Sequence, residues 1–206
     1  MPEEREFKAD VAETFVLPDL DGVGGLRAVD RGTRLLEAVY WDTAQLELMH
    51  GGYGLRHRTT DGRNGLWTLK GGTHREGGAM VREEIEIAGT PQHLPAEIAG
   101  RVTSLVMESA LRPVAQVRTM RHVVDLFAGD EAVAEVADDR VTVLRGDEEV
   151  HRFREVEVEM HGAGDDRVES VLELLRAEGA GPPSASSKYV RALRALGYDV
   201  RGDIAE

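Results

Sequence analysis

The sequence contains no cysteine, which excludes a disulfide framework and a metal site built from thiolates. Its seven histidines include no pair at i, i+4 spacing, which argues against zinc, and no GxxxxGK[ST] run is present to cradle phosphates as a P-loop does. The first ten residues, MPEEREFKAD, lack the apolar core of a signal peptide. We therefore expect a cytoplasmic protein.

Positive charge is also scarce, since the formal net charge is -13 at pH 7. The field of such a surface repels nucleic acid polymers and anionic membranes, so we expect neither as a partner. Any anion-binding site must be local and enclosed. The hydrophobic fraction of 41% and the length of 206 residues suit a soluble protein, and we expect a single domain over residues 1–206. The sequence leaves open whether the protein forms a homodimer.

Lysine is rare even among the basic residues. Only three of the 25 are Lys, namely Lys8, Lys70 and Lys188, and the others are Arg. An ammonium group is a compact point charge on a flexible stem, whereas guanidinium is a planar fork. Positions that keep Lys against this bias are therefore candidates for a tight anion site.

Segments rich in strand-forming residues alternate with turn signals along most of the chain. They predict strands over residues 3–11, 35–43, 53–60, 66–72, 79–87, 113–127, 131–144 and 149–160. Apolar spacing predicts helices over residues 91–108, 165–178 and 186–196, and a helical turn within 44–52. Residues 17–34 are expected to form a loop with a short helix. This count predicts an α+β fold: a closed eight-stranded antiparallel β-barrel, or tunnel, with flanking and C-terminal helices.

Charged residues recur at every second position of several predicted strands, so they share a face. These sets are Glu4, Glu6, Lys8 and Asp10; Arg56 and Arg58; Thr68 and Lys70; Arg82, Glu84 and Glu86; and Glu155, Glu157 and Glu159. One such strand is equally well explained as a sheet with a solvated face. Taken together, the sets favour a charged lumen that binds polyphosphate through its bases and Mg²⁺ or Mn²⁺ through its acids.

The same residues resemble the CYTH domain of the triphosphate tunnel metalloenzymes. An E-x-E-x-K strand stands at Glu4–Lys8, and further motifs follow in the family's order up to residue 196. They are VYWDT at 39–43, L-R-x-R at 55–58, Leu69-Lys70, R-x-E-x-E at 82–86, ADD at 137–139, EVEVE at 155–159 and SSKY at 186–189.

The resemblance implies a metal-dependent phosphoanhydride hydrolase, a triphosphatase. It implies that Glu4, Glu6 and Glu159 hold Mg²⁺ or Mn²⁺, with Glu157 nearby. It implies that phosphate oxygens are bound by Lys8, Arg56, Arg58, Lys70, Arg82, Arg118 and Lys188. It also implies a catalytic set made of Lys8, Glu84, Glu86 and Asp139. In this set Lys8 is expected to contact phosphate, and the three acids are expected to orient the bases or a second metal and its water.

One position departs from the family pattern. Many relatives have two basic residues at alternate positions of the sixth strand, whereas here Arg118 is followed by Met120, and Arg121 is expected on the other face. Either a bulge turns Arg121 inward or one phosphate contact is missing. The expected substrate is inorganic triphosphate or a nucleoside or thiamine triphosphate. The alternatives are a non-catalytic polyphosphate- or nucleotide-binding module, which Met120 motivates, and an adenylate cyclase of the same family.

Overall fold

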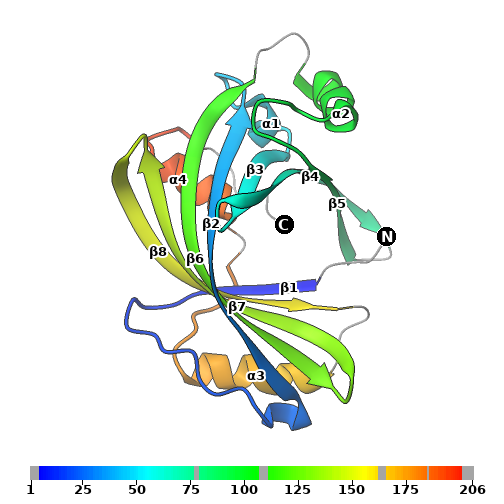
Figure 1. The fold of residues 1–206 in the computed structure, drawn as a ribbon, viewed down its shortest axis with the longest axis vertical. Coiled ribbons are helices and arrows are strands. Elements are labelled where there is room, and N and C mark those ends of the chain that lie inside the picture. Colours follow the sequence, from blue (N-terminus) through cyan, green and yellow to red (C-terminus); the bar gives the residue numbers. More distant parts are fainter. Residues whose placement is uncertain (1–4, 77–78, 107–110, 162–165, 185, 201–206) are drawn as a thin grey trace. The chain divides into compact units, whose positions relative to one another are not determined.

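The central element is an antiparallel sheet of eight strands. The computed structural model describes residues 5–76, 79–106, 111–161, 166–184 and 186–200. Among them the strand order is β1-β8-β7-β6-β2-β3-β4-β5 (Figure 1). The strands are β1 (Arg5–Asp10), β2 (Arg27–Asp42), β3 (Gly54–Thr60), β4 (Arg63–Glu76), β5 (Ala79–Ala88), β6 (Arg112–Ala128), β7 (Glu131–Arg145) and β8 (Glu148–Met160). The helices are η1 (Val23–Gly25), α1 (Glu47–His50), α2 (Ala96–Val106), α3 (Asp166–Ala177) and α4 (Lys188–Ala195).

The prediction of eight antiparallel strands is confirmed, but the predicted closure into a barrel is wrong. Within the described ranges, β1 and β5 end the strand order and no pairing joins them. The edge of β1 that faces away from β8 is bonded to residues 181–184: the Gly181 amide donates to Asp10 O at 2.9 Å and the Ser184 amide donates to Lys8 O at 2.8 Å. These bonds occupy the backbone groups that closure would need.

The chain divides into two compact units, which we describe separately. Unit 1 comprises Met1–Arg34, Thr119–Val141 and Arg152–Ala185, and unit 2 comprises Leu35–Arg118, Thr142–His151 and Ser186–Glu206. Strands β2, β6, β7 and β8 are long enough to contribute to both. A single domain over residues 1–206 stays a prediction.

The core of unit 1 forms where α3 packs on the sheet. The helix buries Val168, Val171, Leu172 and Leu175, which recur at helical spacing. They belong to one cluster with apolar side chains of the strands, among them Phe7, Ala9, Val156 and Val158. Fully burying a Val or Leu side chain contributes about 1.5–3 kcal/mol, so this face is fixed firmly against the helix. The alternate residues of β1 and β8 must then project from the opposite face.

Unit 2 buries one face of β3, β4 and β5 in the same manner. Its core cluster contains Leu48, Leu55, Trp67, Leu69, Ile98, Val102 and Val106, of which the last three belong to α2. The indole N–H of Trp67 donates to Thr90 O at 2.9 Å, which satisfies its polar atom. Residues that alternate with Trp67 and Leu69, such as Lys70, therefore lie on the other face of this part of the sheet.

Two boundaries differ from the sequence prediction. β2 begins at Arg27, inside the segment predicted as a loop, and it contains Gly32 at φ 76°, an irregularity that interrupts the alternation. The β3–β4 turn needs only Asp61 and Gly62, both at positive φ as in a type I′ hairpin. In the described part of the chain no helix combines the length and the hydropathy that a bilayer crossing demands. Cytoplasmic localisation stays a prediction.

Candidate metal and phosphate sites

The pairing of β1 with β8 in unit 1 brings predicted acids and a predicted base onto one face. Glu6 lies opposite Glu159, and Lys8 lies opposite Glu157. Directly opposed residues of antiparallel strands project to the same side. The Lys8 side chain is only 13% exposed, and its Nζ lies 3.6 Å from Glu6 Oε1. Glu4, the other predicted metal ligand of this strand, is outside the described residues.

A buried acidic cluster lies on the same face of β8. Asp139 of β7 and Glu155 and Glu157 of β8 each contribute one carboxylate oxygen, and these oxygens lie within 4.8 Å of one another. Asp139 and Glu155 are completely buried. Carboxylate oxygens are the donors that Mg²⁺ and Mn²⁺ prefer, so the donor set fits the predicted metals. Glu155 was not among the predicted site residues, although its place in the EVEVE alternation was a signal for it.

Arg121 is bound into this cluster. Its Nε donates to Asp139 Oδ1 at 2.8 Å, and one terminal nitrogen donates to Asp139 Oδ2 at 2.6 Å and to Glu157 Oε2 at 2.5 Å. A second terminal nitrogen lies 3.9 Å from Glu135 Oε1. Burial lowers the pKa of the guanidinium, but the hydrogen bond to Asp139 and the three negative charges outweigh it and raise this pKa above its ordinary value. Arg121 is therefore a permanent cation on the acidic face.

Arg118 has a different environment. In unit 2 its terminal nitrogen lies 3.4 Å from Glu37 Oε1, and its side chain is about half exposed. Glu37 pairs with Thr59, so it projects from the face opposite to Arg58. The structure thus does not bring Arg118 together with the other predicted cations of unit 2. Its role in phosphate binding stays a prediction.

Three predicted cations of unit 2, Arg56, Arg58 and Lys70, lie on the face of β3, β4 and β5 that α2 does not cover. Lys70 pairs with Glu84 in the β4–β5 ladder, and their charged atoms are 2.8 Å apart. Two residues before Lys70 on β4, Thr68 Oγ1 donates to Glu86 of β5 at 3.0 Å. Thr68 also pairs with Arg56 of the neighbouring strand β3. The two glutamates therefore hold polar groups of β4 in place.

Arg56 has a donor that could serve an anion. Its Nε is buried and has no hydrogen-bond partner among the described residues. A buried charged donor left unsatisfied is costly, and an anionic oxygen would satisfy it. Arg58 shares this face, two residues further along β3. Arg82 belongs to β5, but its side chain is outside the described part of the chain.

Lys188 opens α4, and the next residue anchors the helix. Ser187 caps the helix, its hydroxyl accepting from the Val190 amide at 3.2 Å. The Tyr189 hydroxyl donates to Asp42 Oδ2 at 2.8 Å, and its ring stacks on Tyr40 with centroids 4.6 Å apart. Burial, followed by the negative charge of Asp42, raises the pKa of Tyr189 above its ordinary value.

The contacts of Asp42 explain why the VYWDT segment contains an acid. Its fully buried carboxylate also accepts the backbone N–H groups of Thr43, Leu48 and Met49, at 2.7–3.0 Å. Two of these donors belong to α1, so one side chain fixes both the start of α1 and the start of α4. Asp42 therefore has a structural role within unit 2, and it was not among the predicted phosphate ligands.

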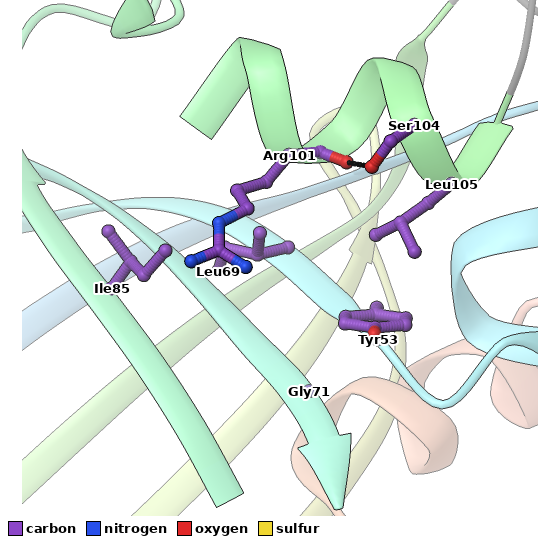
Figure 2. A pocket seen from close by; sticks show the side chains of 7 residues that line it. All are labelled: Tyr53, Leu69, Gly71, Ile85, Arg101, Ser104 and Leu105. Atoms are coloured by element: carbon purple, nitrogen blue, oxygen red, sulfur yellow. Dashed lines mark hydrogen bonds between the residues drawn. The ribbon is translucent and has the colours of Figure 1, made fainter. Parts of the chain in front are cut away.

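A cavity of about 90 Å³ lies on the other face of the β4–β5 pair, beneath α2. Figure 2 shows Arg101, Ser104 and Leu105 of α2 above Leu69 and Ile85. Because Leu69 and Ile85 alternate with Lys70 and Glu84, the cavity is separated from those charged groups by the thickness of the sheet. It is therefore distinct from the predicted phosphate-binding face.

Comparison with protein families and curated sequences gives a consistent answer. The family model described as the CYTH domain matches residues 3–190. Two uncharacterized proteins, one in each of two Mycobacterium tuberculosis strains, are 30% identical to this chain over 210 residues, which is 93% of this chain. The chain spans 40% of the length of each of these relatives.

Solved structures with a similar fold cover nearly the whole chain. A Bacillus halodurans protein described as a candidate adenylate cyclase has a TM-score of 0.62 and 18% identity, covering 92% of this chain and 97% of its own. A Hippeastrum candidate adenylyl cyclase, described as having a dominant triphosphatase activity, has a TM-score of 0.57 and 21% identity, covering 94% and 96%. The PH1819 protein of Pyrococcus horikoshii has a TM-score of 0.53 and 17% identity, covering 93% and 98%. At these identities the likeness establishes the fold.

Proposed function

This chain belongs to the CYTH domain family, and on that premise we propose that it is a divalent-metal-dependent triphosphatase. Its substrate would be inorganic triphosphate or a triphosphate ester, such as a nucleoside or thiamine triphosphate. Hydrolysis of a phosphoanhydride depends on positioning and on neutralising negative charge more than on covalent chemistry by the protein. The charged side chains on the sheet faces of this chain are suited to both tasks.

The observation that carries the proposal is the register of β1 against β8. It pairs Glu6 with Glu159 and Lys8 with Glu157, which puts acids for a hard cation beside an ammonium group for a phosphate oxygen. Glu6, Glu157 and Glu159, together with Glu4, would hold Mg²⁺ or Mn²⁺. When bound, the cation neutralises phosphate charge and makes a coordinated water more acidic. The largely buried side chain of Lys8 would hold a phosphate oxygen in a fixed orientation.

The remaining cations would bind and orient the substrate. Arg56 has a buried donor that finds no acceptor in the part of the chain that the structure describes, and Lys70 is held by Glu84 at 2.8 Å. Arg58, Arg82 and Lys188 would add further positive charge. Fixed cations of this kind stabilise the charge that develops on the phosphate oxygens and on the leaving group in the transition state. Glu84 and Glu86 would act by orienting the basic and hydroxyl groups of β4.

Two other functions have their own support. An adenylate cyclase is suggested by the solved structures described as candidate cyclases, although the Hippeastrum neighbour is itself described as mainly a triphosphatase. A non-catalytic binding module is suggested by Met120, which is 45% exposed where many relatives have a basic residue. We favour the hydrolase, because a module that only binds phosphate needs no paired acids.

The test is release of phosphate from tripolyphosphate, ATP and thiamine triphosphate with Mg²⁺ or Mn²⁺, with cyclic AMP formation from ATP measured in parallel. Glu159→Gln should abolish release while leaving triphosphate binding largely intact. Glu173→Gln, an exposed residue of α3, removes the same charge elsewhere in unit 1 and should change neither. Tight binding without turnover of any substrate would contradict the hydrolase and favour the binding module. Cyclic AMP as the main product would favour the cyclase instead.

A further inference from the structure

The acidic cluster of unit 1 already holds a cation of its own. Arg121 donates to both oxygens of Asp139, and the same guanidinium bonds to Glu157. Its side chain is 18% exposed, and that of Asp139 is fully buried. The paired bond to Asp139 is the fork-to-carboxylate geometry in which arginine binds an acid most specifically. Arg121 therefore lies among the oxygens that would otherwise attract a divalent ion.

A metal on Asp139 would have to share it with this guanidinium. A divalent ion bound to either Asp139 oxygen would lie close to the nitrogen that donates to that oxygen. In a site with little water, two cations at such a distance repel each other strongly. Arg121 cannot escape by losing its proton, because a guanidinium group stays protonated in proteins.

We propose that Arg121 is the resident cation of the Asp139, Glu155 and Glu157 cluster and excludes a divalent metal from Asp139. This deepens the proposed function, since it limits the metal to Glu4, Glu6 and Glu159 and to the oxygen of Glu157 other than the one that Arg121 contacts. Asp139 is then a positioning residue that holds Arg121 and not a ligand of a second metal. The sequence alone left the role of Arg121 open, because Met120 stands where the family pattern has a basic residue.

The test counts bound Mn²⁺ by electron paramagnetic resonance in the full chain without substrate. Arg121→Gln keeps hydrogen-bond donors but removes the charge, so this variant should bind a further Mn²⁺ ion that the wild type does not. The added site should disappear again in the Arg121→Gln, Asp139→Asn double variant. Arg31→Gln is the matched control, because Arg31 pairs with Asp125 at 2.7 Å in the same unit, outside the cluster. Equal Mn²⁺ binding by the two single variants would overturn the inference.

A second variant covers the case in which Arg121→Gln does not fold, as judged by circular dichroism. Asp139→Asn in the wild-type background should leave the affinity for Mn²⁺ within about twofold, since Asp139 is no ligand. A loss of about tenfold or more would overturn the inference. Phosphate release is measured separately, so the two proposals can fail independently. A further Mn²⁺ site in Arg121→Gln supports the inference even where the wild type hydrolyses nothing.

Discussion

Tyr189 and Asp42 offer the sharpest test of how the SSKY motif is held in place. Tyr189→Phe removes one hydroxyl, the donor of the 2.8 Å bond to Asp42, and keeps the ring that stacks on Tyr40. Asp42→Ala removes the acceptor of that bond and of three backbone N–H groups. Both residues are buried, so water does not replace the lost partners.

The expected losses follow from the number of bonds broken. A hydrogen bond to a charged group contributes roughly 1.5–3 kcal/mol, so Tyr189→Phe should lower the free energy of unfolding by about 2 kcal/mol. Asp42→Ala strands several buried donors and removes the cap of α1, for which we expect about 4 kcal/mol or more. Since native proteins are stable by only about 5–15 kcal/mol, the second variant should be close to unfolding.

Urea unfolding followed by circular dichroism measures both losses and their coupling. In the Asp42→Ala background the hydroxyl has lost its acceptor, so adding Tyr189→Phe should cost little or nothing further. A Tyr189→Phe variant within about 0.5 kcal/mol of the wild type would refute the reasoning, because surface-like changes have effects of that size.

The buried Tyr189 hydroxyl should also make the stability of the protein depend on pH. The pKa of Tyr189 is raised in the folded protein, chiefly by burial and then by Asp42, whereas an unfolded tyrosine titrates near its ordinary value of 10.0. Above that pH the unfolded chain loses a proton that the folded chain keeps, so stability should fall as pH rises. Below pH 10 this contribution is fully present. The fall between pH 9.5 and 11 should be shallower in Tyr189→Phe, and equal slopes would contradict the assignment.

Three further results are expected. Lys70→Gln should leave stability within about 1 kcal/mol, because its pair with Glu84 is only partly buried, yet it should raise KM for tripolyphosphate about tenfold. The control Arg63→Gln, at an exposed residue of the same strand, should leave KM unchanged. Gly71→Ala should destabilise by about 1–3 kcal/mol in urea unfolding, since the added Cβ would lie 2.1 Å from the ring of Tyr53, and Tyr53→Ala should restore part of the loss. Chelation by EDTA should abolish phosphate release, and added Mg²⁺ or Mn²⁺ should restore it.

Most elements were predictable because their periodicity is strong. The predicted strands over residues 131–144 and 149–160 match β7 and β8 closely, and the helix predicted over 165–178 matches α3. In each case one face is apolar at a period of two or of 3.6 residues. The first part of β2 lacked this signal, since Gly32 at positive φ interrupts the alternation.

Closure of the sheet could not be judged from the strand count. Whether two edge strands pair depends on what else competes for their backbone groups, and that is a tertiary property. Between the two helices predicted over residues 165–178 and 186–196 stands Gly181-Pro182-Pro183, a sequence that breaks helices. Two amides of this neighbourhood, from Gly181 and Ser184, nevertheless bind the edge of β1. Nothing in the local sequence distinguishes a turn that binds an edge strand from one that does not.

Arg121 marks the limit of motif matching at the site. The alternation predicts Arg118 and Arg121 on opposite faces of the strand, and the motif favoured Arg118 as the phosphate ligand, which stays a prediction. A count from the apolar end of β6 places Arg121 on the face opposite to α3, since Val124 and Leu126 pack in the cluster of α3 and Arg121 is an odd number of residues from both. Val123 is apolar as well and obscures this parity, so only the bonds from Arg121 to Asp139 and Glu157 decide which face it occupies.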